Sequence, residues 1–316
     1  MKLQTTIRLN KLQENLIDHN AKIVLLGSCF SENIGERLQY FKFQTTQNPF
    51  GIFFHPVAIN RFITDVINQK QYTEADIFYH QERWHCFHAH SSLSASDKNV
   101  FLHRLNRFAS QTLQQLKAAS HVIVTLGTSW VYRHIESDAI VANCHKIPQK
   151  KFSKELLTTA EISENLSAMV SLLKTVNKTV TVVFTISPIR HLKDGFVENT
   201  LSKAHLVAAV HKVIAPKKNS HYFPSYEFMM DELRDYRFYA EDLIHPNTTA
   251  INYIWEKFID TWCTENTKPI LKKIDLIQKG LAHQPFNESS EAHQQFLNRV
   301  QLQIKTVKDQ FSFVEF

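Results

Sequence analysis

The chain has 316 residues, of which 43% are hydrophobic and 21% charged, a balance that is ordinary for a globular protein. Its formal net charge is +6, but the basic residues are scattered rather than gathered in one stripe, so we expect no nucleic-acid partner. No run of about 18 apolar residues occurs, and no membrane span is predicted.

Cysteine usage indicates the compartment. The four cysteines, Cys29, Cys86, Cys144 and Cys263, form no close C-x-x-C pair, which in a chain of this length is typical of free thiols. The amino terminus also lacks the apolar core of a signal peptide. We therefore predict a cytoplasmic protein.

Short apolar runs alternate with amphipathic helical patterns along most of the chain. In order, the predicted elements are a strand at 22–27, a helix at 30–40, a short strand at 42–46, a helix at 56–69, an irregular stretch at 70–95, a long helix at 96–119, a strand at 121–127, an excursion at 134–152, a helix at 156–177, a strand at 179–188, a helix at 198–214, a strand at 221–229 and a helix at 248–262. This alternation predicts an α/β protein with a parallel sheet of four or five strands and helices on both faces.

The pattern changes near residue 264, where two amphipathic helices are predicted at 267–282 and 290–310. We expect residues 1–263 to form the main domain and residues 264–316 to be a helical extension packed on it. The alternative is that these helices contact a partner or a second copy, and the sequence indicates no oligomeric state.

Polar side chains of catalytic types follow the first and last predicted strands. Ser28 comes directly after the strand at 22–27, and the next helix points its unpaired N–H groups at the same place. Asp242 and His245 are close enough in sequence for the carboxylate to orient the imidazole within one turn. A serine hydroxyl needs such a base to become a nucleophile. Cys29 is a second possible nucleophile, but one turn aims only one of two adjacent side chains into a crevice, and Ser28 is favoured.

Several segments resemble the blocks of a known family. Gly27-Ser-Cys-Phe-Ser31 resembles the signature that names the GSCFA family, with serine in place of the final alanine. The other blocks follow in the order that this family shows, and they are Asn48-Pro-Phe-Gly-Ile-Phe-Phe-His-Pro56, Thr125-Leu-Gly-Thr-Ser-Trp-Val-Tyr132, Ser187-Pro-Ile-Arg-His191 and Asp242-Leu-Ile-His-Pro246. The tail around His283-Gln-Pro-Phe286 also looks family-like.

The GSCFA family is similar to the SGNH, or GDSL-like, hydrolases. That resemblance implies a flavodoxin-like three-layer α/β/α sandwich and serine esterase chemistry that needs no metal or organic cofactor. By position, it implies Ser28 as the nucleophile, Asp242 and His245 as the rest of a catalytic triad, and Gly51 as a glycine of the oxyanion hole.

One position departs from the SGNH pattern. Ser129 stands where those enzymes carry an asparagine that donates to the oxyanion, and a missing donor costs roughly 3 kcal/mol of transition-state stabilisation. Thr128, Ser129 or Asn48 could replace it. We expect the backbone N–H groups of Ser28 and Gly51 to hold the oxyanion beside one of these replacements.

Arg190 and His191 follow the strand at 179–188 and are expected at the rim of the crevice. They could bind an anionic or polar group of the substrate, and the alternative is a solvated loop or an ion pair. The histidines at 80, 85, 88 and 90, with Cys86, fit no standard zinc spacing, so we favour a lid or substrate wall over a metal site. His55 is expected to cap a helix.

Together these patterns predict a serine esterase or acyl hydrolase that acts on a small-molecule or carbohydrate ester. His245 would accept the proton of Ser28, and Asp242 would hold the imidazole. The alternative is a non-catalytic ligand-binding protein that retains the hydrolase fold. A third interpretation is a zinc-dependent enzyme that uses the histidine cluster.

Overall fold

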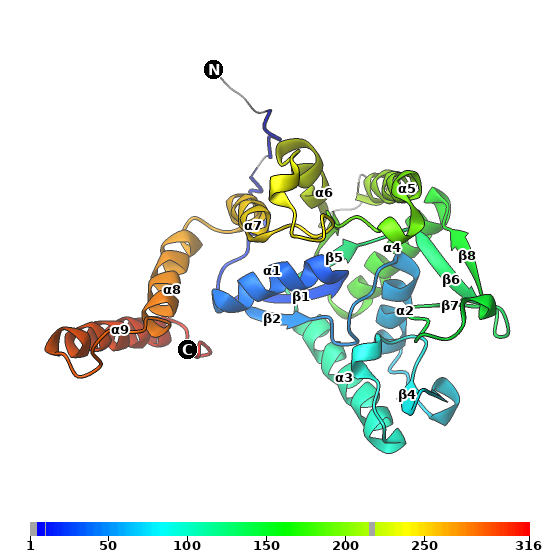
Figure 1. The fold of residues 1–316 in the computed structure, drawn as a ribbon, viewed down its shortest axis with the longest axis horizontal. Coiled ribbons are helices and arrows are strands. Elements are labelled where there is room, and N and C mark those ends of the chain that lie inside the picture. Colours follow the sequence, from blue (N-terminus) through cyan, green and yellow to red (C-terminus); the bar gives the residue numbers. More distant parts are fainter. Residues whose placement is uncertain (1–4, 10, 215–218) are drawn as a thin grey trace.

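The computed structural model describes residues 5–9, 11–214 and 219–316. Within them lies a five-stranded sheet, whose neighbouring strands are all parallel (Figure 1). Its strands are β1 (Lys22–Gly27), β2 (Gln44–Gln47), β5 (His121–Leu126), β9 (Thr181–Ile186) and β10 (Ser220–Phe223). They lie in the order β2-β1-β5-β9-β10, which is the order 2-1-3-4-5 of flavodoxin-like folds when they are counted along the chain. The predicted α/β class is therefore confirmed.

The two faces of the sheet carry different helices. Because successive strand residues point to opposite faces, Ile23 and Leu25 pack into one hydrophobic cluster, whereas Val24 and Leu26 pack into another. The first cluster includes α1 (Cys29–Tyr40) and α7 (Thr248–Trp262). The second includes α2 (Pro56–Ile67), α3 (Lys98–Ala118), α4 (Thr159–Val176) and α5 (Phe196–Ile214). The result is a three-layer α/β/α sandwich.

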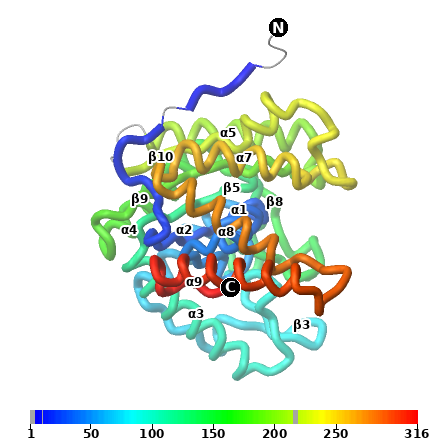
Figure 2. Tube along the Cα trace, turned by 90° about the vertical axis from the view of Figure 1, so that its left-hand side faces the viewer, coloured from blue at the N-terminus to red at the C-terminus, as the bar shows by residue number. Residues whose placement is uncertain are grey.

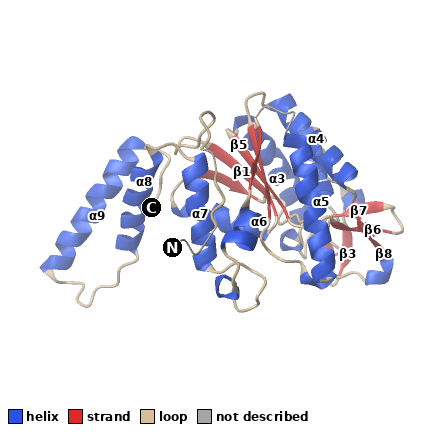
Figure 3. Cartoon of the chain, turned by 90° about the horizontal axis from the view of Figure 1, so that it is seen from above, coloured by secondary structure: helices blue, strands red, loops and turns tan. Residues whose placement is uncertain are grey.

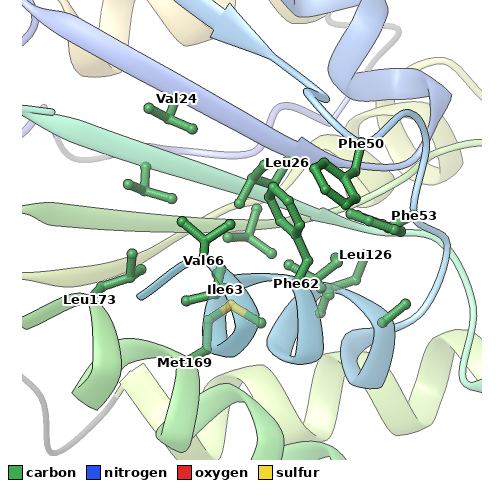
Figure 4. Packing of buried hydrophobic residues seen from close by; sticks show 14 of the residues in the cluster. Val24, Leu26, Phe50, Phe53, Phe62, Ile63, Val66, Leu126, Met169 and Leu173 are labelled. Carbon is green, nitrogen blue, oxygen red and sulfur yellow. The ribbon is translucent and has the colours of Figure 1, made fainter. Parts of the chain in front are cut away.

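Figure 4 shows the larger cluster at close range. Phe62 and Val66 of α2 lie against Val24 and Leu26 of β1, and Met169 of α4 belongs to the same cluster. These side chains are at most 2% exposed, so the apolar burial that holds α2 and α4 on the sheet is nearly complete.

Within the described residues, a smaller sheet of three antiparallel strands is inserted between β5 and α4. It consists of β6 (Trp130–His134), β7 (Ala139–Val141) and β8 (Phe152–Leu156), in the order β7-β6-β8. The predicted excursion at 134–152 thus contains β7 and includes the end of β6 and the start of β8. Likewise, the stretch at 70–95 contains a short hairpin of β3 (Phe78–His80) and β4 (Arg83–His85).

The last predicted strand, at 221–229, is too long. β10 ends at Phe223, because Pro224 follows it, and the chain turns into α6 (Ser225–Glu227) and a π-helical turn at Phe228–Glu232. Short 3₁₀ turns lie at Glu74–Asp76, Ser91–Leu93, Gln149–Lys151, Leu192–Asp194 and Tyr236–Phe238.

Helices α8 (Thr267–Leu281) and α9 (Glu291–Gln310) pack against each other on the far side of α7 from the sheet (Figure 3), and Figure 2 views the molecule from their side. Tyr40 links α1 to α8, since its hydroxyl donates to Asp275 Oδ1 (3.0 Å) and its carbonyl accepts from Gln278 Nε2 (3.0 Å). Among the described residues, no helix combines the length and the apolar composition that crossing a bilayer requires.

Candidate active site

The turn between β1 and α1 is built around Gly27. Its φ is +132°, and a Cβ there would lie 2.1 Å from the carbonyl oxygen of Thr125, so only glycine fits. Ser28 then donates its N–H to the same oxygen (3.0 Å), and α1 begins at Cys29. The chain thus turns from strand to helix within two residues, and it leaves Cys29 at the first helical position.

Asp242 and His245 lie in the loop before α7. Leu243 between them has a φ of +57°, which bends the backbone so that Asp242 Oδ1 accepts the N–H groups of Ile244 and His245 (2.9 Å each). The other carboxylate oxygen lies 2.6 Å from His245 Nδ1. The contact between carboxylate and imidazole that the sequence spacing predicts is therefore present. These hydrogen bonds, those from the two N–H groups foremost, lower the pKa of Asp242 to about 2, so the carboxylate is ionised at neutral pH.

The free nitrogen of His245 faces a thiol. In a neutral imidazole whose Nδ1–H donates to Asp242, Nε2 carries the lone pair, and Nε2 lies 4.0 Å from Cys29 Sγ. Burial raises the pKa of the Cys29 thiol, although the N–H group of Cys29 and the charge of Lys203 oppose that shift in part. The thiol is therefore protonated at neutral pH, with a base beside it that can accept the proton.

Ser28, which the sequence favours as the nucleophile, makes no hydrogen bond to His245. Its side chain is 0% exposed, and its Oγ has no hydrogen-bond partner among the described residues. It also makes no capping bond to α1. Of the two adjacent side chains, the one that faces the imidazole is that of Cys29, so this geometry does not support the preference for Ser28.

The backbone N–H groups of Ser28, Gly51, Thr128 and Ser129, which were predicted to lie at the oxyanion hole, all serve the protein's own structure. Each of these N–H groups already donates a hydrogen bond, from Ser28 to Thr125 O (3.0 Å), from Gly51 to Asn48 O (2.7 Å), from Thr128 to Phe54 O (2.9 Å) and from Ser129 to Ser202 Oγ (2.8 Å). The hydroxyls of Thr128 and Ser129 also contact Ser202 Oγ (3.0 Å each). The structure therefore does not bring these residues together as a set of free donors.

Gly51 and Asn48 belong to the support of the β1–α1 turn. Asn48 Oδ1 accepts the N–H of Gly27 (2.9 Å), and both Asn48 and Gly51 line a separate, polar pocket. Asn48 Oδ1 thus supports the turn, whereas its Nδ2 is buried with no hydrogen-bond partner among the described residues.

A pocket of about 660 Å³ opens beside Cys29 and His245. That volume suits a small molecule. Part of its wall comes from the small antiparallel sheet, with the aromatic side chains of Trp130, Tyr132 and Phe152, and much of the rest comes from the loops at 142–149 and 189–194. The consecutive aromatic and β-branched residues Trp130-Val-Tyr132 are the sequence signal for this strand, and Val131 is buried.

Arg190 and His191 both line this pocket. The Arg190 guanidinium lies 4.9 Å from the centre of the Tyr239 ring, and no carboxylate of the described residues forms an ion pair with it. His191 packs its ring edge-on against Phe54 (5.6 Å), and its Nε2 is buried with no hydrogen-bond partner in the described chain. Burial, together with the charges of Lys203 and His245, lowers the pKa of His191 to about 3, which keeps this imidazole neutral.

The sequence interpretation missed Lys203, in α5. Only 1% of this residue is exposed, and its Nζ donates to the carbonyl oxygens of Gly127 and Ser187 (2.7 Å each). The sequence does contain a signal that Lys203 is buried, because Lys203 shares the apolar face of α5 with Leu206 and Val210.

The histidine-rich segment has a structural role here. His85 bridges Ser94 Oγ (2.7 Å) and the carbonyl of His80 (3.0 Å). No residue from 78 to 90 lines the pocket beside Cys29, so the interpretation as a substrate wall gains no support.

The described chain contains no group of three or more His, Cys, Asp or Glu side chains that could hold a metal ion. His55 caps α2 by accepting the N–H of Ala58 (3.2 Å), as predicted.

Comparison with known proteins places these observations in a family. The model of the GSCFA family matches residues 22–258, and the model of the GSCFA C-terminal domain matches residues 274–316. A search of curated proteins found no match. Because the first match covers most of the chain, including the β1–α1 turn and the Asp242–His245 loop, this protein belongs to the GSCFA family.

Proposed function

We propose that this protein transfers an acyl group from an ester to water, or to another hydroxyl, with Cys29 as its nucleophile. The observation that carries the proposal is the line of contacts from Asp242 Oδ2 to His245 Nδ1 (2.6 Å) and from His245 Nε2 to Cys29 Sγ (4.0 Å). A nucleophile, a base and a group that orients the base are the parts that such a reaction needs. The sulfur–nitrogen distance is long, as is common before substrate binds.

Acylation uses each of these groups once. His245 Nε2 takes the proton of the Cys29 thiol while the sulfur attacks the ester carbonyl carbon, and the carbonyl electron pair moves to oxygen. When the oxyanion collapses, the bond to the leaving alcohol breaks, and that alcohol takes the proton from His245. The acyl group is left on Cys29 as a thioester.

Deacylation repeats the steps with a new acceptor. His245 takes a proton from water, whose oxygen attacks the thioester carbonyl. The carbon–sulfur bond then breaks, the acid is released, and the thiolate of Cys29 recovers its proton from His245. Throughout, the ionised Asp242 fixes the tautomer of His245 and stabilises its charged form.

The N-terminus of α1 supports the oxyanion. Cys29 is its first residue, and the Ser28 side chain leaves the first N–H groups uncapped. Such N–H groups have no partner within the helix, and the helix dipole adds to their attraction for negative charge. This source of stabilisation does not depend on Gly51, Thr128 or Ser129, whose N–H groups are engaged elsewhere.

The pocket and the family's resemblance to SGNH hydrolases favour an ester substrate of small size, such as an O-acylated carbohydrate or metabolite. The aromatic wall of Trp130, Tyr132 and Phe152 suits an apolar acyl group or a sugar face, and Arg190 suits an anionic group. A nucleophilic thiol works only in its reduced form. All four cysteines of the chain lie in the described part and are free, which supports a cytoplasmic location.

Turnover of p-nitrophenyl butyrate by three variants tests the proposal. We expect Cys29→Ala and His245→Ala to lose at least about 1,000-fold in kcat/KM, and Ser28→Ala to keep most of the wild-type value. Loss in Ser28→Ala with labelling of Ser28 by a fluorophosphonate, while Cys29→Ala stays active, would assign the reaction to the serine. A ligand that binds tightly to a protein with no turnover would indicate the non-catalytic binding protein.

A further inference from the structure

The central sheet has an open edge at β2. Among the described strands, β2 pairs with β1 alone, and its register with β1 is continuous over Gln44–Gln47. Proteins commonly protect such an edge with a lysine, a proline or a bulge, because its unpaired N–H and C=O groups attract another strand. The sequence Gln-Thr-Thr-Gln of β2 has none of these devices. This edge is therefore free to accept a further strand.

The backbone of Thr45 and Gln47 faces away from β1. In a parallel pair, the N–H and C=O groups of one residue point to one neighbour, and those of the next residue point to the opposite side. The N–H of Asn48 donates to Leu25 O of β1 (2.9 Å), so Asn48 and Thr46 face β1, whereas Thr45 and Gln47 face outward. No described strand pairs with these outward groups. They form the row that an added strand would bond.

The polar pocket described above lies along this edge as a groove of about 690 Å³, and we call it the edge groove. Thr46 and Gln47 line it between two walls, α1 on one face of the sheet and α3 on the other (Figure 1). Gln47 lies on the α1 side, because a Cβ on Gly35 would be 2.1 Å from its Oε1, and Thr46 points to the α3 side because strand residues alternate. The lining of the edge groove includes neither Cys29 nor His245, so this is a second site.

The two walls of the edge groove differ in charge. The α1 wall carries Glu32 and Glu36, one helical turn apart, and neither carboxylate forms an ion pair within the described chain. The polar residues of the α3 wall are Arg104, Gln111, Thr112 and Gln115. The Arg104 guanidinium donates to Leu93 O (3.0 Å), so it is already engaged by the protein itself. An occupant thus meets negative charge on the α1 side and amide and hydroxyl groups on the α3 side.

We propose that the edge groove binds an extended peptide of a partner protein, which adds to β2 as a further strand and carries Lys or Arg at alternate positions. The outward backbone groups of Thr45 and Gln47 supply the main-chain hydrogen bonds of this β-augmentation. Because side chains of a strand alternate between its faces, every second side chain of the peptide points to the α1 wall, where a cation meets Glu32 and Glu36. The side chains between them meet the α3 wall, which suits Ser, Thr, Asn or Gln.

The charge of the whole chain separates this proposal from general electrostatic attraction. The formal net charge is +6, so the surface as a whole repels a cationic peptide and attracts an acidic one. Binding of a cationic peptide therefore has to come from the local carboxylates and the sheet edge.

Fluorescence anisotropy of the labelled peptide Lys-Thr-Lys-Thr-Lys-Thr, with blocked termini, tests the proposal. We expect saturable binding that Thr45→Pro weakens at least about tenfold, because proline has no N–H to donate and its ring covers the edge. Thr45→Val is the matched control, since it keeps the N–H and the shape of the side chain, and its Kd is expected to equal that of the wild-type chain. Absence of binding to the wild-type chain, or equal Kd values for the two variants, would overturn the proposal.

A second variant covers the case in which Thr45→Pro does not fold. The double variant Glu32→Gln, Glu36→Gln is expected to bind the Lys-Thr peptide about three- to tenfold more weakly, and to bind the peptide Gln-Thr-Gln-Thr-Gln-Thr as the wild-type chain does. Glu164→Gln, at an exposed position of α4, is the control, and it should leave both Kd values unchanged. An unchanged Kd of the Lys-Thr peptide in the double variant would overturn the proposal.

The edge of a second copy is the other candidate occupant, and sedimentation velocity distinguishes it. We expect the wild-type chain without peptide to sediment as Thr45→Pro does. A wild-type dimer that Thr45→Pro converts to a monomer would overturn the proposal in favour of pairing between two copies. These readouts are binding and mass, so their outcome does not depend on whether the protein turns over an ester.

Discussion

His245 Nε2 lies 4.0 Å from Cys29 Sγ, although 216 residues separate the two in the chain. The parallel sheet explains the approach, because Cys29 follows the carboxyl end of β1, and the loop of Asp242 and His245 covers the same edge of the sheet. β1 and β5 are also the strands at which the strand order reverses, which is where ligands bind in such folds.

Replacing Asp242 by asparagine is expected to lower kcat for p-nitrophenyl butyrate by about 1,000- to 10,000-fold. The amide keeps an oxygen for the two N–H groups of the loop but stabilises the wrong tautomer of His245. Asp235→Asn removes an exposed carboxylate that pairs with Arg237, and it should leave kcat unchanged. A loss below about tenfold in Asp242→Asn would show that the carboxylate does not orient the base.

Replacing Arg190 by methionine is expected to raise KM for an ester with an anionic group, such as a hemisuccinate, by about tenfold, without a change in kcat. KM for a neutral ester of similar size should stay the same, because the guanidinium then has no charge to bind. Arg237→Met is the control, since that arginine is exposed and does not line the pocket. Equal effects on both esters would assign Arg190 a role in packing.

The stability of the protein is expected to fall in acid because of His55. Burial lowers its pKa to about 4 in the folded protein, against about 6.5 in the unfolded chain. Above pH 6.5 the His55 imidazole is neutral in both the folded and the unfolded state. Between pH 6.5 and 4, His55 binds a proton in the unfolded chain but stays neutral in the folded protein. The free energy of unfolding therefore falls as the pH drops from about 6.5 towards 4, with a loss of roughly 2 kcal/mol from this group near pH 5.

Urea unfolding at several pH values measures this loss. His55→Gln should show a smaller dependence on pH than the wild-type protein, whereas His103→Gln, at an exposed position of α3, should show the same dependence. Identical slopes in all three proteins would contradict the assignment to His55.

Gly27→Ala is expected to destabilise the fold by about 3 kcal/mol or more, because its Cβ would lie 2.1 Å from a backbone oxygen at a φ of +132°. Gly35→Ala is the matched control. There the Cβ meets only the end of the Gln47 side chain, which can rotate away, and the helix interior favours alanine by up to about 1 kcal/mol. Urea unfolding compares the two, and equal stabilities would contradict the account of the β1–α1 turn.

The sequence predicts the central strands well because β1, β5 and β9 are buried on both faces and therefore carry three or four consecutive apolar residues each. It predicts β6 poorly, since only Val131 of its five residues is buried and the run of aromatic and β-branched residues is three long. The end of β10 is set by Pro224, and Phe228 beyond it is apolar because it packs against α7 rather than in a strand.

The site itself is predicted in part. The contact between Asp242 and His245 is local, so its spacing is readable from the sequence. The choice between Ser28 and Cys29 is not, because it depends on which of two neighbouring side chains the first turn of α1 directs at a loop more than 200 residues away. Likewise, only the three-dimensional structure shows that the Gly51 N–H group already donates a hydrogen bond to Asn48 O.

The most direct test of the account is the identity of the acylated residue. After rapid mixing with p-nitrophenyl butyrate and an acid quench, fragmentation of the peptide that carries Ser28 and Cys29 locates the butyryl group. We predict a butyryl thioester on Cys29 that neutral hydroxylamine removes, and none in His245→Ala. A butyryl group on Ser28 that resists neutral hydroxylamine, or a protein that turns the ester over without acylating Cys29, would contradict the account.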